Sequence, residues 1–181
     1  MTRNLVVRLL ALAAAVTISA GNALAQPKAL GVVQSYRGLW VSYEHSVADD
    51  CFICADAGVL MTGIFSGETS VPGASAEIKW NFMFFRRDIP ECGQLRVFAG
   101  PGLTIGYGTD LRMDSGHGPF FGICGNLGVE CCFNRGLTLS ATVLPILGSH
   151  ILIYEDYARM VLYRNGLVYG LVPQIGIKYN F

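Results

Sequence analysis

The end of the chain most constrains its fold, because polar and apolar residues alternate there over a long run. Most odd-numbered positions from 167 to 181 are apolar or aromatic, and most even-numbered positions are small or polar. A period of two is typical of a β-strand with one apolar face and one polar face. The run therefore predicts a strand that contacts hydrocarbon on one side and a polar interior on the other, as in a transmembrane β-barrel.

Residues 1–25 have the pattern of a removable secretory signal peptide. Arg3 and Arg8 give a basic start, an apolar stretch follows, and Ala23-Leu24-Ala25 is a small-residue cleavage site. Cleavage between Ala25 and Gln26 leaves residues 26–181 as a single mature barrel domain. A retained membrane anchor is the alternative, which the short, Ala-rich segment disfavours.

The composition of the mature chain excludes some partners and agrees with a narrow barrel. Loss of Arg3 and Arg8 with the signal peptide leaves 11 basic residues against 13 acidic ones. This near-balance argues against a nucleic-acid partner. No long apolar run of helical type follows residue 25, and 21 of the 22 glycines lie in the mature chain, which suits an interior with little room for side chains.

The alternation extends along the mature chain and predicts an all-β fold, an eight-stranded antiparallel up-and-down transmembrane β-barrel. The predicted strands are residues 29–36, 39–46, 52–65, 76–87, 95–108, 120–133, 137–147 and 167–181. Short turns alternate with longer loops after the first hairpin, which predicts periplasmic turns, surface loops and both termini in the periplasm. A secreted β-sandwich adhesin is the alternative fold, but its apolar faces would point inward.

Several motifs resemble the small eight-stranded outer-membrane barrels of Gram-negative bacteria, of the OmpA/OmpX type and porin-like. They are FAGPGLTIGY at 98–107, GICGNLGVE at 122–130, the ending GIKYNF at 176–181 and the cleavage site Ala23–Ala25. The resemblance implies a monomer in the bacterial outer membrane, surrounded by lipid and lipopolysaccharide, without a cofactor. It also implies that the assembly machinery reads Ile177, Tyr179 and Phe181, and that the outer loops can bind a surface ligand.

Six cysteines depart from that resemblance, since small outer-membrane barrels usually contain few. Cys51 and Cys54 have the C-x-x-C spacing of a redox dithiol, which belongs at a strand-to-helix turn and not at the start of a strand. Structural thiols or disulfides in an oxidising compartment are the preferred interpretation over a dithiol or a metal site. Cys51 and Cys92 are the predicted disulfide pair, on the expectation that the third strand begins beside the end of the fourth.

Charged residues on the inward positions form the candidate functional site. An eight-stranded barrel is just wide enough for its own side chains, so buried opposite charges must pair. The predicted network consists of Glu44, Asp56, Glu77, Lys79, Arg87, Arg96, Glu130 and Lys178. It predicts an ion-paired plug, with a narrow ion path as the alternative.

Catalysis is not expected, although some barrels of this size act on lipid A with Ser, His and an acid. His45 and His150 are the histidines with a neighbouring serine, and adjacent residues on a strand point to opposite faces. His117 lies near Asp114 and Ser115 in a Gly-rich loop. The sequence therefore predicts a structural, loop-presenting protein that serves envelope integrity, adhesion or interaction. A channel and a lipid A-modifying enzyme are the alternatives.

The last loop, residues 150–166, is unusually apolar and carries three tyrosines. We expect its flanking strands to extend past the membrane as a hairpin around Glu155 and Asp156; an exposed binding ridge is the alternative. Trp40, Trp80 and Tyr179 are among the residues expected at the bilayer interfaces.

Overall fold

The computed structural model describes residues 28–65, 67, 71–90, 93–110, 117–133, 136–153 and 158–181. The predicted signal peptide, with its cleavage site between Ala25 and Gln26, lies outside these residues. The described chain is dominated by antiparallel strands, of which those forming the barrel wall are β1 (Lys28–Ser35), β2 (Gly38–Ala48), β3 (Cys51–Leu60), β4 (Gly73–Ile89), β5 (Gly93–Thr109), β6 (His117–Phe133), β7 (Leu137–Val143), β8 (Ile146–Ile153) and β10 (Gln174–Asn180).

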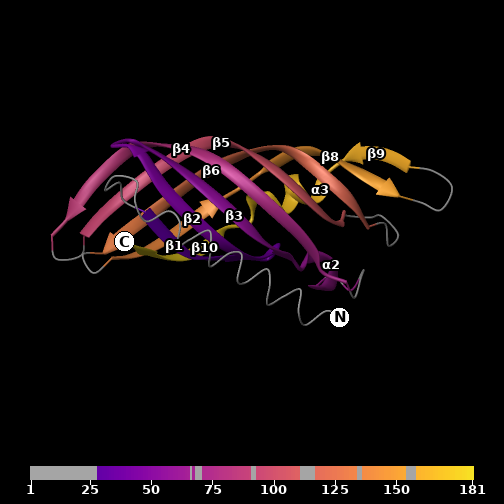
Figure 1. The fold of residues 1–181 in the computed structure, drawn as a ribbon, viewed down its shortest axis with the longest axis horizontal. Helices are drawn as coiled ribbons and strands as arrows, with labels where there is room; N and C mark the ends of the chain where they lie inside the picture. Colours follow the sequence, from indigo (N-terminus) through magenta and orange to yellow (C-terminus); the bar gives the residue numbers. More distant parts are fainter. Residues whose placement is uncertain are drawn as a thin grey trace.

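The sheet closes on itself, because β1 pairs with β2 on one side and with β10 on the other (Figure 1). Strands β7 and β8 occupy one position in the ring, since both pair with β6, at different heights. Counted in this way, the barrel has eight strands in up-and-down order, and the predicted fold class is confirmed. We call the end that holds Lys28 and Phe181 the terminal rim, and the opposite end the loop rim.

The predicted seventh strand, residues 137–147, is interrupted at Leu144-Pro145. Proline has no N–H to donate to a ladder, so pairing breaks there and β8 starts after it. The chain then turns back as β9 (Ala158–Leu162), which pairs with β8 and projects beyond the barrel at the loop rim (Figure 1). The predicted hairpin is confirmed, although its turn at 154–157 lies outside the described residues.

The predicted eighth strand, residues 167–181, is wrong in its first part. Residues before Gln174 form α3 (Arg164–Val168) and a 3-10 turn, η1 (Tyr169–Leu171). Alternation alone could not exclude this, because Leu167 and Leu171 also lie one helical turn apart. The helical segment packs tightly on β8, where the missing side chain of Gly166 leaves room for Ile146 and Tyr163.

The predicted third strand, residues 52–65, also ends early. Strand β3 stops at Leu60, and α2 (Thr62–Phe65) begins the connection to β4 at the loop rim (Figure 1). Strands β4, β5 and β6 are 17 residues each and are therefore longer than predicted. Together they extend the wall past the start of β3.

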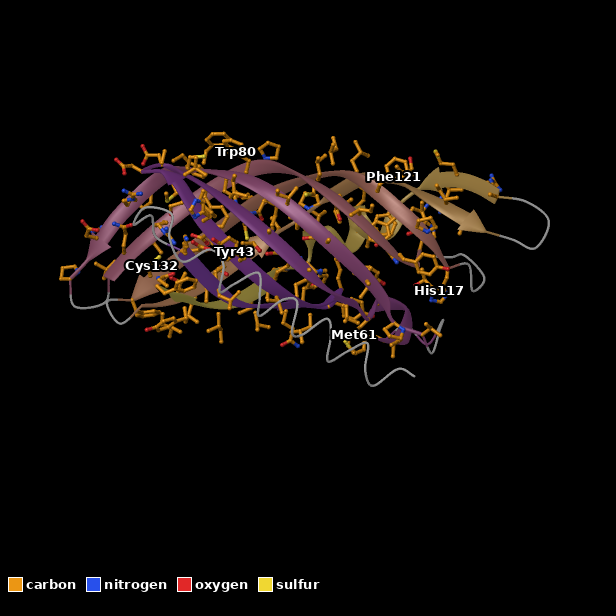
Figure 2. The ribbon with its side chains drawn as sticks, viewed as in Figure 1. Tyr43, Met61, Trp80, His117, Phe121 and Cys132 are labelled. Carbon is orange, nitrogen blue, oxygen red and sulfur yellow. The ribbon has the colours of Figure 1, made fainter. Side chains whose placement is uncertain are left out.

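The two faces of the barrel are inverted relative to a soluble protein. Outward positions carry large exposed apolar side chains, such as Ile123 at 59% exposure, and Trp80 and Phe121 point away from the barrel (Figure 2). Inward positions carry buried polar and charged groups, such as Asn81 and Glu130 at 0%. A secreted sandwich requires the opposite arrangement, with two packed sheets around an apolar core. That alternative is therefore wrong.

Strands β4 and β5 approach each other closely at Gly100, which leads to a first prediction. A Cβ placed there would overlap the Trp80 carbonyl oxygen and lie 2.7 Å from the carbonyl carbon and 2.8 Å from Asn81 Cα. Gly100→Ala is therefore expected to lower the free energy of unfolding by about 1–3 kcal/mol, the usual cost of overpacking. Urea unfolding in detergent micelles measures the change. Gly125→Ala is the control, because its Cβ would meet only Pro145 Cγ at 3.7 Å; equal loss in both variants would contradict the prediction.

Candidate functional site

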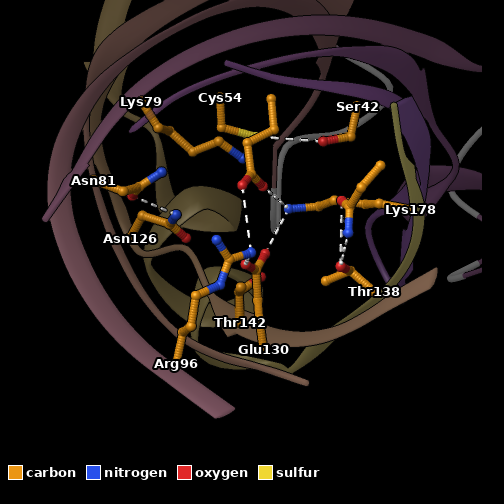
Figure 3. Close-up of polar contacts among 12 residues, drawn as sticks. Ser42, Cys54, Lys79, Asn81, Arg96, Asn126, Glu130, Thr138, Thr142 and Lys178 are labelled. Carbon is orange, nitrogen blue, oxygen red and sulfur yellow. Dashed lines mark hydrogen bonds and ion pairs between the residues drawn. The ribbon is translucent and has the colours of Figure 1, made fainter. Parts of the chain in front are cut away.

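Four charged side chains near the terminal rim form one compact group, the terminal cluster (Figure 3). Lys178 Nζ lies 2.8 Å from Glu44 Oε2 and 2.6 Å from Glu130 Oε1. Arg96 Nη2 lies 2.8 Å from Glu130 Oε2 and 3.6 Å from Glu44 Oε1. They come from β2, β5, β6 and β10, so the cluster ties opposite walls of the barrel together.

A second group, the central cluster, lies further toward the loop rim. Lys79 Nζ pairs with the Asp56 carboxylate and lies 3.9 Å from Glu77 Oε2. Arg37 Nη2 lies 3.4 Å from the other oxygen of Glu77, and all four side chains are buried. Acids and bases are equal in number within each cluster, so each is neutral overall. Such pairing is what allows charges to be buried at all.

Arg87 was predicted in this network and is not part of it. Its side chain is exposed, because β4 carries a β-bulge between Met83 and Phe85 that breaks the alternation of faces. Arg37 takes the place of the missing cation, from the turn between β1 and β2. Sequence reasoning missed it because turn residues have no assigned face. With Arg87 included, the predicted network had four acids and four bases, so no surplus of acids pointed to Arg37.

Uncharged side chains fill most of the lumen between and around the clusters. Asn126 Nδ2 donates to Asn81 Oδ1 at 2.8 Å, and Phe52 packs edge-to-face on Phe98 with 5.0 Å between ring centroids. The cavity next to the two asparagines measures about 10 Å³. This is room for about one water molecule.

Apolar residues form a buried cluster inside the barrel near the loop rim. Tyr163 stacks on Phe120 with 4.2 Å between ring centroids, and both side chains are buried. Trp40, expected at a bilayer interface, is instead inside the barrel, where its Nε1 donates to Ser75 Oγ at 2.8 Å. Like Ser42 and Glu44, Trp40 has an even number on β2, and the even-numbered side chains of this part of the strand point inward. Trp80 and Tyr179 are exposed on the outer face.

The carboxylate of Asp110 holds α3 in place at the loop rim. Asp110 accepts hydrogen bonds from the backbone N–H of Arg164 at 2.9 Å and of Asn165 at 2.6 Å, while Asn165 Nδ2 donates to the Thr109 carbonyl oxygen. These N–H groups belong to the first turn of α3 and have no partner within the helix. Asp110 therefore serves as its cap from the end of β5.

Asp110→Ala is expected to destabilise this end of the barrel by about 1–3 kcal/mol, because it leaves buried donors unpaired. Hydrogen–deuterium exchange should become faster in α3 and η1 and stay unchanged in β4 and β5. Asp88→Ala on the exposed end of β4 is the control. Unchanged exchange in α3 would show that the Asp110 carboxylate does not hold the segment.

The cysteines do not form a dithiol in the C-x-x-C motif. Cys51 lies on the outer face, where Trp80 Nε1 donates to its sulfur at 2.7 Å, whereas Cys54 is buried in the lumen beside Asp56. Both thiols are free, as are those of Cys124, Cys131 and Cys132.

The expected neighbourhood of the Cys51–Cys92 pair is not found. Cys51 lies opposite Phe82, and β4 continues past that point to Ile89 before it turns. The start of the third strand is therefore not beside the end of the fourth. Cys51 is free in this structure and Cys92 lies outside the described residues, so the disulfide stays a prediction that the structure does not support.

The histidines lie on three strands, β2, β6 and β8, and two of them contact backbone carbonyls. His150 is buried, with Nε2 3.0 Å from Gly108 O and 3.2 Å from Gly118 O. His117 Nε2 lies 3.3 Å from Val71 O. His45 is half-buried on β2. Asp114 and Ser115, considered beside His117, lie outside the described residues.

The described residues show neither a metal site nor a helix that could span a membrane. They contain no group of three or more His, Cys, Asp or Glu side chains placed to hold a metal ion. None of the helices in this part of the chain is long and apolar enough to cross a membrane.

A closed eight-stranded antiparallel barrel with a polar interior and an apolar exterior has the architecture of the small outer-membrane barrels, as the resemblance predicted. The chain is similar to the N-terminal β-barrel domain of OprF from Pseudomonas aeruginosa. The two are 17% identical, the match covers 86% of this chain and 96% of that one, and the TM-score is 0.48. No protein-family model and no curated protein matches the chain.

Proposed function

We propose that the mature chain is an integral protein of the bacterial outer membrane that presents its loop rim at the cell surface. Its role is structural and loop-presenting, in envelope integrity, adhesion or interaction with a surface ligand. One observation carries the proposal: apolar side chains cover the outside of the ring, whereas the charged groups inside are paired. This arrangement suits hydrocarbon outside and is unfavourable in water.

The connections support the direction of insertion. The β2–β3 turn at the terminal rim is short, whereas the β3–β4, β5–β6 and β8–β10 connections at the loop rim are longer. Outer-membrane barrels have short periplasmic turns and longer surface loops. The proposal therefore places the terminal rim in the periplasm, with lipid around the strands and lipopolysaccharide around the loop rim.

Membrane insertion is tested by fractionation and gel migration. The protein should remain in the outer-membrane fraction after urea washing, and it should migrate differently on a gel before and after boiling. Recovery as a soluble periplasmic protein would overturn the proposal.

The filled lumen supports a plug over a channel. Both ion clusters cross the interior, and the cavity between them measures about 10 Å³. Planar-bilayer recordings of the purified barrel should show no unitary conductance. Resolved current steps would favour the narrow channel, the second candidate.

No catalytic reaction is part of the proposal. His150 supports this, because its Nε2 contacts backbone carbonyls and its Nδ1 has no hydrogen-bond partner among the described residues, whereas a general base needs a nucleophile within hydrogen-bond reach. Mass spectrometry of lipid A should be identical in cells with and without the protein. A modified lipid A that depends on the protein would favour the enzyme alternative.

The C-terminal residues are proposed to guide assembly. Ile177, Tyr179 and Phe181 share the outer face of the closing strand, and Phe181 is 64% exposed. Deletion of Phe181 is expected to lower the amount of folded protein in the outer membrane while leaving refolding from urea into detergent largely intact. The control is Asn180→Ala on the neighbouring position. Equal membrane levels of the deletion variant and the wild type would contradict this role.

A further inference from the structure

A small cavity lies at the junction of the two ion clusters. Lys178 of the terminal cluster lines it, as do Asp56 and Lys79 of the central cluster. Asn81 and Asn126 project into the same part of the lumen from β4 and β6 (Figure 3). The cavity is therefore lined by polar groups on one part of its wall and by Val33, Phe52 and Phe98 on the rest, and its volume of about 10 Å³ is near the smallest that holds one water molecule.

The asparagine pair leaves one donor and one acceptor without a partner. The bond from Asn126 Nδ2 to Asn81 Oδ1 uses half of the amide groups. Asn81 Nδ2 and Asn126 Oδ1 have no hydrogen-bond partner among the described residues, although Asn81 is 0% and Asn126 5% exposed. Exchanging oxygen and nitrogen in both amides again leaves one donor and one acceptor, so the conclusion does not depend on amide orientation.

The unpartnered donor of Asn81 and the unpartnered acceptor of Asn126 determine which kind of molecule can bind in the cavity. A molecule that satisfies both must accept a hydrogen bond from one amide and donate one to the other. A metal cation donates no hydrogen bond, and a simple anion such as chloride has no proton to donate. The nearby charges are already paired, Lys79 with Asp56 and Lys178 with Glu130, so a neutral molecule adds no uncompensated charge.

We propose that this cavity is a binding site for a single ordered water molecule, which accepts from Asn81 Nδ2 and donates to Asn126 Oδ1. Hydroxyl and amide groups of Ser42, Ser140, Thr142 and Gln174 line the same space and offer further partners. The water completes a polar layer between the terminal and central clusters. This site depends on the filled lumen and is independent of where the protein is located.

Nuclear magnetic resonance on the full mature chain in detergent micelles tests the proposal, with the Asn side chains ¹⁵N-labelled. The Asn81 amide protons should show cross-peaks to water, with opposite signs in laboratory-frame and rotating-frame experiments, as for a long-lived bound water. The Asn180 amide, which donates to Thr138 Oγ1 at the half-buried terminal rim, is the internal control and should lack such cross-peaks. A visible Asn81 amide without a water cross-peak, or with the equal signs of proton exchange, would overturn the site.

A pair of variants separates this water from a general effect on the lumen. Asn126→Leu removes the acceptor and should abolish the Asn81 cross-peak, whereas Asn180→Leu at the rim should leave it unchanged. Persistence of the cross-peak in Asn126→Leu would also overturn the proposal. The wild-type measurement is decisive by itself if Asn126→Leu does not fold. None of these results bears on membrane insertion, which fractionation tests separately.

Discussion

Glu130→Gln is expected to lower the free energy of unfolding by about 3–5 kcal/mol, because it removes the shared anion of the terminal cluster. The carboxylate is fully buried and contacts both Lys178 and Arg96. Its neutralisation leaves the buried Lys178 and the half-buried Arg96 with Glu44 as their remaining acid in this cluster. Urea unfolding of the barrel in lipid vesicles, followed by tryptophan fluorescence, measures the loss.

Two further variants establish the cause. The double variant Glu130→Gln/Lys178→Met keeps one cation, Arg96, and one anion, Glu44, and should be more stable than Glu130→Gln alone. Asp88→Asn removes an exposed carboxylate that accepts from Gln94, and it should change stability by less than about 0.5 kcal/mol. A small loss in Glu130→Gln, comparable to that of Asp88→Asn, would contradict the buried ion cluster.

Ile123→Arg should destabilise the barrel by about 2–4 kcal/mol in a bilayer, the cost of a basic residue on the lipid face near the membrane centre. Ile123 lies near the middle of β6, points outward and pairs with Leu103 of β5. Because exposure to hydrocarbon is the cause, the loss should be much smaller in a small-micelle detergent, where the charge reaches water more easily.

The control for this variant is Ala158→Arg. Ala158 is exposed on β9, in the hairpin that projects past the ring, so its substitution should cost about 0–1 kcal/mol. If Ile123→Arg were as mild as Ala158→Arg in the bilayer, the outer face would not be a lipid-contacting surface.

Much of the candidate site could be predicted from alternation alone. Glu44, Asp56, Glu77, Lys79, Arg96, Glu130 and Lys178 all occupy inward positions of regular strands, where the two-residue period fixes the face of each side chain. Arg87 follows a bulge, and one inserted residue reverses the assignment of every later position. Arg37 lies in a turn, where the period gives no information. Both errors arise where the backbone leaves the regular pleat.

The segment formed by α3 and η1 shows a second limit of prediction from the sequence. Pro173 and Leu144-Pro145 mark where pairing stops, but only the assembled wall shows what replaces it. The capping carboxylate, Asp110, is more than fifty residues away in sequence from the N–H groups that donate hydrogen bonds to it. The Tyr163–Phe120 stack is equally non-local. Contacts of this kind depend on how distant strands meet.

The sequence by itself determined the fold class, the number of strands and the face of most side chains, because these follow from a local period of two residues. The tertiary structure decided which charges meet and form two neutral clusters. It also decided where the ring gives way to a helix, and how little space remains in the lumen. These features require the closed ring, since closure brings β10 beside β1 and aims side chains from opposite walls at one another.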